Sequence, residues 1–228
     1  MIKRIEITFD NNPGEAPLCW DFDYTLTKSV NIKDDFNEIE PPEWGKLGNH
    51  KCANCTLKTE DHPFCPAARS LYTYAKNIIN RKSIDTATVH IWDKSGRHLQ
   101  LNKLPLQEIT GEIVRMSVFQ SACPVGRRAR KVVDFIPPFP ANEEVIKAFA
   151  LFFAIQKLQN DDNDQDKNAQ YLNTLNDVFA NLSHRIQDFS KGDAGVNGVL
   201  IYHSLMMLMS LSLPKELEKA IASLGEEF

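Results

Sequence analysis

The clearest indication of the fold of this 228-residue chain is the stretch Ala87-Thr-Val-His-Ile-Trp-Asp-Lys-Ser-Gly-Arg-His-Leu-Gln-Leu101. Every second position is apolar from 87 to 91, and apolar residues return at 99 and 101 after a turn that ends in Gly96. Period-two alternation on both sides of a glycine-containing turn is typical of a β-hairpin with one buried face. We therefore expect two antiparallel strands here.

A second hairpin is expected at the N-terminus. Apolar residues alternate with polar ones from 5 to 9, Pro13-Gly14 forms a turn, and the alternation resumes from 19 to 24. Between the hairpins, residues 67–80 place apolar side chains on one helical face, with Pro66 in the first turn, where its missing N–H is harmless. The order β-β-α-β-β predicts one small antiparallel sheet with a helix packed on it.

The rest of the chain is predicted to be helical. A helix is expected at 106–120, and the almost entirely apolar helix at 143–158 should be central and buried. Residues 160–168 should form an exposed connection. Apolar steps of three and four from 172 to 189 predict a packing seam against a buried helix at 199–213, which should end at Pro214 before a short last helix.

The predicted fold class is therefore α+β: a small antiparallel sheet of two hairpins with a packed helix, followed by a helical C-terminal part. We expect residues 1–140 to form an α+β metal-binding part, for the reason given below. Residues 141–228 should form a helical part that packs on the first as one unit.

Composition excludes some function classes. The formal net charge is −4 and the pI is about 5.9, whereas general nucleic-acid binders are basic, so a nucleic acid is not an expected partner. The apolar run at 199–213 is shorter than the roughly 20 residues of a membrane span, and the N-terminus lacks the apolar core of a signal peptide. We expect a cytoplasmic protein with reduced cysteines and no membrane partner.

The most unusual stretch holds three cysteines and two histidines within sixteen residues: His50, Cys52, Cys55, His62 and Cys65. Zinc prefers four thiolate or imidazole ligands at tetrahedral corners, and Cys-x-x-Cys lets two sulfurs of one turn converge on one ion. His62-Pro-Phe-Cys65 supplies a second pair of the same span. The two pairs together would close a Cys₃His zinc site, with His50 outside the ligand set.

Cys123 offers a different fourth ligand. Cys65 and Cys123 are each followed by proline, and a cysteine pair with two isolated Cys-Pro cysteines is an arrangement that iron–sulfur clusters also use. Four cysteines would hold either zinc or a [4Fe–4S] cluster and would join the sheet to the helical half. A third alternative is thiol chemistry at Cys65, because the start of a helix would stabilise a thiolate there.

Other titratable residues carry weaker signals. Cys19, on a strand, is expected to be a small buried hydrophobic residue. The isolated histidines are expected to be structural or exposed: His90, His98, His184 and His203. A dense basic patch beside Cys123 suits either a solvated loop or an acidic or phosphate-bearing partner; its residues are Arg127, Arg128, Arg130 and Lys131.

Several of these residues stand in a longer pattern. Trp44 precedes Cys52-Ala-Asn-Cys55-Thr-Leu57, and His62-Pro-Phe-Cys65-Pro, Ser121-Ala-Cys123-Pro124 and Pro138-Phe139 before Glu143 follow within residues 1–160. In this pattern the chain resembles an uncharacterised bacterial protein family, a domain of unknown function. The resemblance implies that Cys52, Cys55, His62, Cys65 and Cys123 belong to one site, and it implies no activity.

These observations predict a non-enzymatic metal-binding protein whose cysteine-rich site is structural or sensory, with zinc the leading metal. Cys52, Cys55 and Cys65 are expected ligands, and either Cys123 or His62 completes the set. An iron–sulfur redox or sensor protein with a [4Fe–4S] cluster and a thiol-based enzyme are the alternatives.

Overall fold

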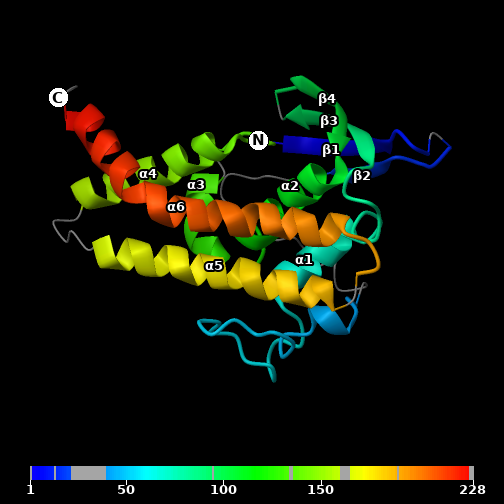
Figure 1. Cartoon of the computed structure of the whole chain (residues 1–228), viewed down its shortest axis with the longest axis horizontal. Helices are drawn as coiled ribbons and strands as arrows, with labels where there is room; N and C mark the ends of the chain where they lie inside the picture. Colours follow the sequence, from blue (N-terminus) through cyan, green and yellow to red (C-terminus); the bar gives the residue numbers. More distant parts are fainter. Residues whose placement is uncertain are drawn as a thin grey trace.

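The computed structural model describes residues 2–12, 14–21, 40–93, 95–133, 136–159, 165–188 and 190–225. Four strands form one antiparallel sheet in the order β2-β1-β3-β4: β1 (Ile2–Phe9), β2 (Leu18–Asp21), β3 (Thr86–Asp93) and β4 (His98–Pro105). Both predicted hairpins are confirmed, with residues 22–24 of the first lying outside the described residues. The α+β fold class is also confirmed (Figure 1).

Alternation along the strands determines which face of the sheet is covered. Ile5, Ile7 and Phe9 on β1 are buried, as are their register partners on β3, because both strands turn these side chains to the same face. Helices α1 (Pro66–Ala75) and α2 (Leu106–Phe119) lie on that side (Figure 1). Trp20 of β2 packs edge-on against Tyr74 of α1, with ring centroids 5.6 Å apart.

The C-terminal half is a set of packed helices: α4 (Asn142–Gln159), α5 (Gln165–Gln187) and α6 (Ala194–Gly225). The turn η3 (Gly126–Ala129) and the short helix α3 (Arg130–Val133) join α2 to them, and the turn η2 (Glu43–Gly45) precedes the cysteine-rich loop. Helix α6 contacts α2, α4 and α5. The predicted seam is confirmed because its residues on α5 are buried: Leu172, Leu175, Phe179, Leu182 and Ile186.

Three helical predictions require correction. Helix α6 does not end at Pro214 but continues to Gly225. Leu213 and Leu217 are both buried, and this packing on either side of the proline favours a continuous helix over the loss of one backbone hydrogen bond. Of the connection expected at 160–168, residues 165–168 belong to α5, and residues 160–164 lie outside the described residues. Helix α4 is not buried all round, because Leu151 and Ile155 are 44% and 42% exposed.

Helix α6 also has the length and apolar composition of a membrane-spanning helix. The candidate span runs from Ala194 to Ser223, and 39% of its most apolar window is buried inside the protein. Its buried residues face α2, α4 and α5, as in the core helix of a soluble protein. The same composition therefore fits both kinds of helix.

Candidate metal centre

Four cysteines line one small cavity of about 20 Å³. Cys52 and Cys55 come from the loop that follows η2, Cys65 from the start of α1, and Cys123 from the turn after α2. Apolar side chains and one arginine complete the lining: Leu47, Leu57, Val125, Val178, Leu182 and Arg185. Figure 1 shows the cysteine-rich loop, coloured light blue to cyan, alongside α5 and α1.

Cys65 is fixed where the loop returns to the helix. It is the N-cap residue of α1, and its backbone N–H donates to the Gly45 carbonyl at 2.8 Å. The Leu47 N–H donates to the Pro63 carbonyl at 2.9 Å, so the two ends of the loop pair with each other. This pairing sets the position of the Cys65 thiol against Cys52 and Cys55.

Cys52 and Cys55 form a tight turn. The Cys55 N–H donates to the Cys52 carbonyl at 3.1 Å, and both thiols are half-buried. Between them, the Ala53 N–H donates to the Asp177 carboxylate of α5 at 3.0 Å. A helix more than a hundred residues away in sequence therefore holds the Cys-x-x-Cys turn in place.

Cys123 is buried and surrounded by backbone donors. The N–H groups of Val125 and Gly126 point to its sulfur, an arrangement that favours a thiolate. Gly126 is required here, because a Cβ at this position would lie 2.0 Å from the Val118 carbonyl oxygen. The sequence does not mark Gly126 as necessary, because the atom that its backbone approaches, the Val118 carbonyl oxygen, belongs to the preceding helix.

Arg185 anchors the loop from α5. Its side chain lies among the largest fully buried ones, and its guanidinium donates to backbone carbonyls at distances of 2.5 to 3.3 Å; the acceptors are Trp44, Lys46, Leu47 and His50. None of the ion pairs found among the described residues involves Arg185. Arg185 lines the same cavity as the four thiols, and its positive charge would offset part of the negative charge of thiolates there.

Burial raises the pKa of two of the four thiols, Cys52 and Cys123. Burial, with smaller contributions from the neighbouring thiols and Asp177, raises the pKa of Cys52 to about 12. Burial also raises the pKa of Cys123 to about 11, although the two backbone N–H groups oppose the shift. Both thiols are therefore protonated at neutral pH unless a cation enters the cavity.

The histidines of the motif lie elsewhere. His62 is exposed and does not line the cavity. His50 is also exposed, where its Nε2 lies 2.8 Å from the Asp188 carboxylate and its ring stacks on His184. In the described part of the chain, no three His, Cys, Asp or Glu side chains form a ready-made metal-ligand group. The four cysteines thus share a cavity without yet converging on one point.

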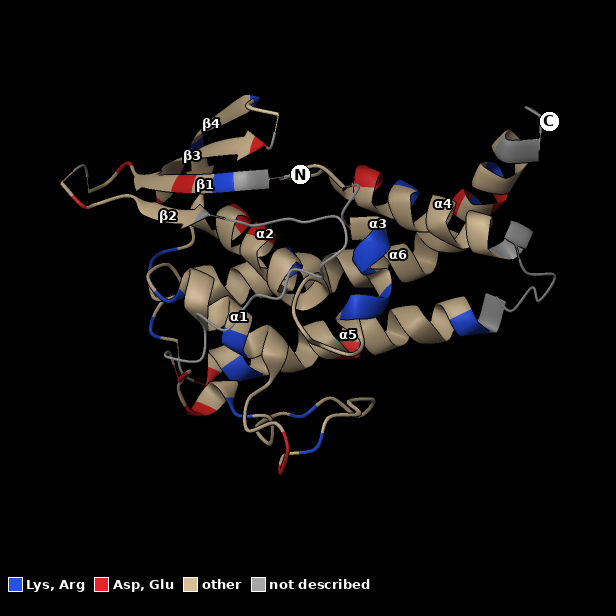
Figure 2. Ribbon diagram, turned by 180° about the vertical axis from the view of Figure 1, so that it is seen from behind, with Lys and Arg blue, Asp and Glu red and all other residues tan. Residues whose placement is uncertain are grey.

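The basic patch lies next to this cavity. Arg127, Arg128 and Lys131 are exposed, and the Arg128 guanidinium lies 4.8 Å from the centroid of the Tyr171 ring. Figure 2 shows lysine and arginine gathered at α3, beside the middle of α5. An acidic or phosphate-bearing partner at this patch stays a prediction.

Comparison with known proteins gives the family. Residues 9–224 match a family described as a domain of unknown function, DUF6901. The chain belongs to this family. Searches of curated proteins and of solved structures return no match. The expected resemblance to an uncharacterised family is confirmed, and the family brings no activity with it.

Proposed function

We propose that this protein is a cytoplasmic, non-enzymatic metal-binding protein with a structural Cys₄ site. The observation that carries the proposal is the cavity lined by Cys52, Cys55, Cys65 and Cys123, which come from three separate segments. Burying four thiols around one cavity has little value for packing alone, whereas zinc takes four thiolates in structural sites. Metal binding would require the cysteine side chains to rotate toward a common centre.

Cys123, not His62, is the proposed fourth ligand. Cys123 lines the cavity and receives two backbone N–H groups at its sulfur, whereas His62 is exposed and outside the lining. Hydrogen bonds to a ligating sulfur are a common outer-shell feature of metal sites. Arg185, which also lines the cavity, would offset part of the negative charge of four thiolates.

The size of the cavity favours a single ion. A volume of about 20 Å³ holds one ion or one water molecule. Tetrahedral zinc with sulfur ligands at about 2.3 Å requires the sulfurs to stand about 3.8 Å apart. A [4Fe–4S] cluster is several times larger and would have to displace the apolar side chains around the cavity.

Metal content of matched variants tests the ligand set. We expect about one zinc per chain in the wild-type protein purified without oxygen, and clear loss of zinc in Cys65→Ser and Cys123→Ser. His62→Ala should retain the wild-type content. Cys19→Ser is the control for loss of a cysteine, because Cys19 is exposed on β2 and outside the cavity. Retention of zinc by Cys123→Ser, or its loss from His62→Ala, would contradict the proposed set.

A [4Fe–4S] cluster is the second candidate, favoured by one observation. The cavity has an all-cysteine donor set within apolar walls that include Leu47 and Val178, and such surroundings also suit iron–sulfur clusters. Brown protein with broad visible absorbance and about four irons per chain would establish this candidate in place of zinc. Colourless protein that carries zinc would dismiss it.

Thiol catalysis is the weakest of the three functions. A nucleophilic cysteine needs a lowered pKa, whereas burial raises the pKa of both Cys52 and Cys123. Slow, uniform alkylation of all four cavity cysteines in the metal-loaded protein is the expected result. Rapid alkylation of one of them would favour an enzyme.

A further inference from the structure

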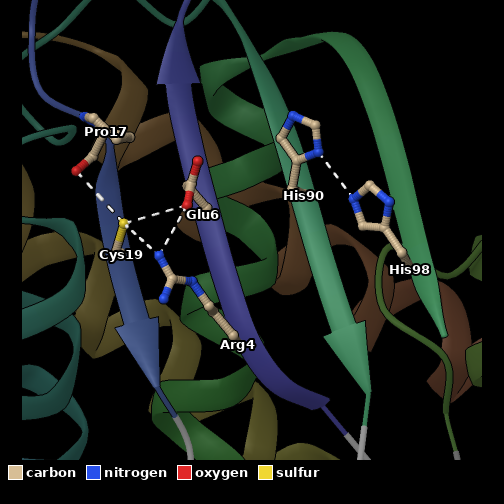
Figure 3. Close-up of polar contacts among 6 residues, drawn as sticks. All are labelled: Arg4, Glu6, Pro17, Cys19, His90 and His98. Carbon is tan, nitrogen blue, oxygen red and sulfur yellow. Dashed lines mark hydrogen bonds and ion pairs between the residues drawn. The ribbon is translucent and has the colours of Figure 1, made fainter. Parts of the chain in front are cut away.

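The face of the sheet opposite α1 and α2 carries a second group of side chains that can ligate a metal. Glu6 of β1 is the register partner of Cys19 on β2 and of His90 on β3. The neighbouring positions on β1 and β3 are buried against the helices, so Glu6 and His90 point to the opposite face. Figure 3 shows Cys19, Glu6, His90 and His98 in one band across the four strands.

Cys19 belongs to this face, which corrects one prediction. It was expected to be buried, but it is exposed, with its sulfur 3.6 Å from the Glu6 carboxylate. The alternation along β2 places it opposite Glu6 on the solvent side. The alternation from 19 to 24 could have placed it there, because Cys19 is in phase with Asp21 and not with Trp20.

Two histidines meet within the band. His90 Nδ1 and His98 Nε2 lie 2.9 Å apart, and the planes of the two rings differ by 6°. Trp92 stacks on His98 with centroids 4.8 Å apart and on His90 with centroids 5.7 Å apart. The indole therefore holds both rings in one orientation, with one imidazole donating a hydrogen to the other.

The separation of 2.9 Å between the two nitrogens is an ordinary hydrogen-bond distance, and it also suits two ligands of one metal ion. Two imidazole nitrogens bound at 2.0–2.1 Å to one metal ion, at a right angle, stand about 2.9 Å apart. Right-angle geometry with nitrogen and oxygen ligands is typical of Cu²⁺ and Ni²⁺, whereas tetrahedral zinc would require about 3.4 Å. The metal would take the place of the shared hydrogen after each ring turns by about 45°, because the two nitrogens now face each other and would both have to point at an ion beside the line that joins them.

Glu6 supplies a third ligand. Glu6 lies directly opposite His90, where Cβ atoms stand about 5 Å apart. Its carboxylate is turned toward Arg4 and Cys19 (Figure 3) and would have to swing across the sheet to reach a metal held by His90. Glu6 accepts a hydrogen bond from Arg4 at 3.0 Å. That ion pair is partly exposed and contributes little to stability, so Glu6 can turn toward the metal at small cost.

We propose that His90, His98 and Glu6 form a solvent-facing site for a divalent transition metal with tetragonal or octahedral preference, Cu²⁺ or Ni²⁺. The site is separate from the cysteine cavity, whose lining residues belong to the cysteine-rich loop, α1, the turn after α2, and α5. Its nitrogen and oxygen donors select a different metal from the one that four thiolates prefer. Among the described residues no three such side chains already form a ligand group, so binding through all three requires Glu6 to move.

The test is a calorimetric titration of the purified full-length protein with Ni²⁺, which does not oxidise thiols. We expect one Ni²⁺ per chain at this site. His90→Gln and His98→Gln should each weaken binding by about tenfold or more, because loss of a residue that only supports a ligand already costs about tenfold. His62→Gln is the matched control, because His62 is exposed and lies outside the band. Glu6→Gln should weaken binding to a smaller extent.

The double variant His90→Gln/His98→Gln separates the two sites. Any Ni²⁺ taken up by the cysteines appears equally in the double variant and in the wild-type protein, so their difference reports the sheet site alone. Wild-type affinity in both histidine variants, or an equal loss in His62→Gln, would overturn the proposal. Unchanged affinity in Glu6→Gln would remove Glu6 from the ligand set. Unchanged circular dichroism of the variants would establish that they fold.

Discussion

At the scale of single residues, Arg185 holds the segment that leads to the candidate site against α5. Its guanidinium satisfies four backbone carbonyls of the segment that leads into the Cys-x-x-Cys turn. Without Arg185 the buried carbonyls of Trp44 and Leu47 would lose this donor, and the loop would lose four of its hydrogen bonds to α5. A charged residue three positions after Leu182, on the buried side of an amphipathic helix, is the signal in the sequence that could have found it.

Replacing this residue tests its role. Arg185→Gln should lower the free energy of unfolding by about 3 kcal/mol, because one amide cannot replace four hydrogen bonds, of which those to Trp44 and Leu47 are buried. Urea denaturation measures the loss. Arg127→Gln removes an exposed arginine and should change stability by less than about 0.5 kcal/mol. Equal stability of the two variants would show that Arg185 does not anchor the loop.

At the scale of the elements, strands and helices were predictable wherever one face is buried. The period-two stretches became β1 and β3, and the seam from 172 onward became α5, because burial imposes these periods on the sequence. Pro214 misled the prediction because tertiary packing at Leu213 and Leu217 overrides a local breaker. The cysteines were visible as a motif, whereas the partners of Asp177 and Arg185 could not be predicted, because they lie more than a hundred residues away.

The contact between α2 and α6 depends on Gly198. A Cβ there would lie 2.6 Å from the Thr110 Cβ. Glycine-to-alanine changes inside helices usually stabilise by about 1 kcal/mol, but overpacking costs about 1–3 kcal/mol, so we expect Gly198→Ala to destabilise the fold. Gly111→Ala is the control, since its nearest neighbours lie at an ordinary 3.5 Å. Thermal melting that shows Gly198→Ala to be the more stable variant would contradict the close packing.

Asp193 links the loop before β3 to the start of α6. Hydrogen bonds from the Ser83 N–H at 2.7 Å and from its hydroxyl at 2.9 Å lower the pKa of this carboxyl. Since the folded pKa lies below the unfolded value of about 3.9, this link stabilises the protein above that pH and is lost as pH falls through the folded pKa. Asp193→Asn should therefore show a shallower loss of stability between about pH 5 and pH 2 than wild type. Identical pH profiles from denaturation at each pH would count against the link.

At the scale of the whole molecule, the cysteine cavity joins parts of the chain that are distant in sequence. Cys123 follows α2, Cys65 begins α1, and the loop that carries Cys52 and Cys55 lies on α5. A metal in this position would act as a clasp between the sheet half and the helical half. The motif predicted a metal site, and the structure was needed to show that the four cysteines line one cavity against α5.

Removal of the metal is the prediction at this scale. Chelation should lower the melting temperature and increase hydrogen exchange across residues 45–125, because binding free energy of a structural metal is folding free energy. Residues of α4, remote from the cavity lining, should change less. A protein that has lost its metal and melts as before would exclude a structural role for the site.

X-ray absorption at the zinc edge of the protein purified without oxygen tests most directly whether four cysteine sulfurs hold one zinc ion. We expect a single shell of four sulfurs at about 2.3 Å with no nitrogen or oxygen ligand. A first shell that contains an imidazole nitrogen, or a protein that carries iron and no zinc, would contradict it.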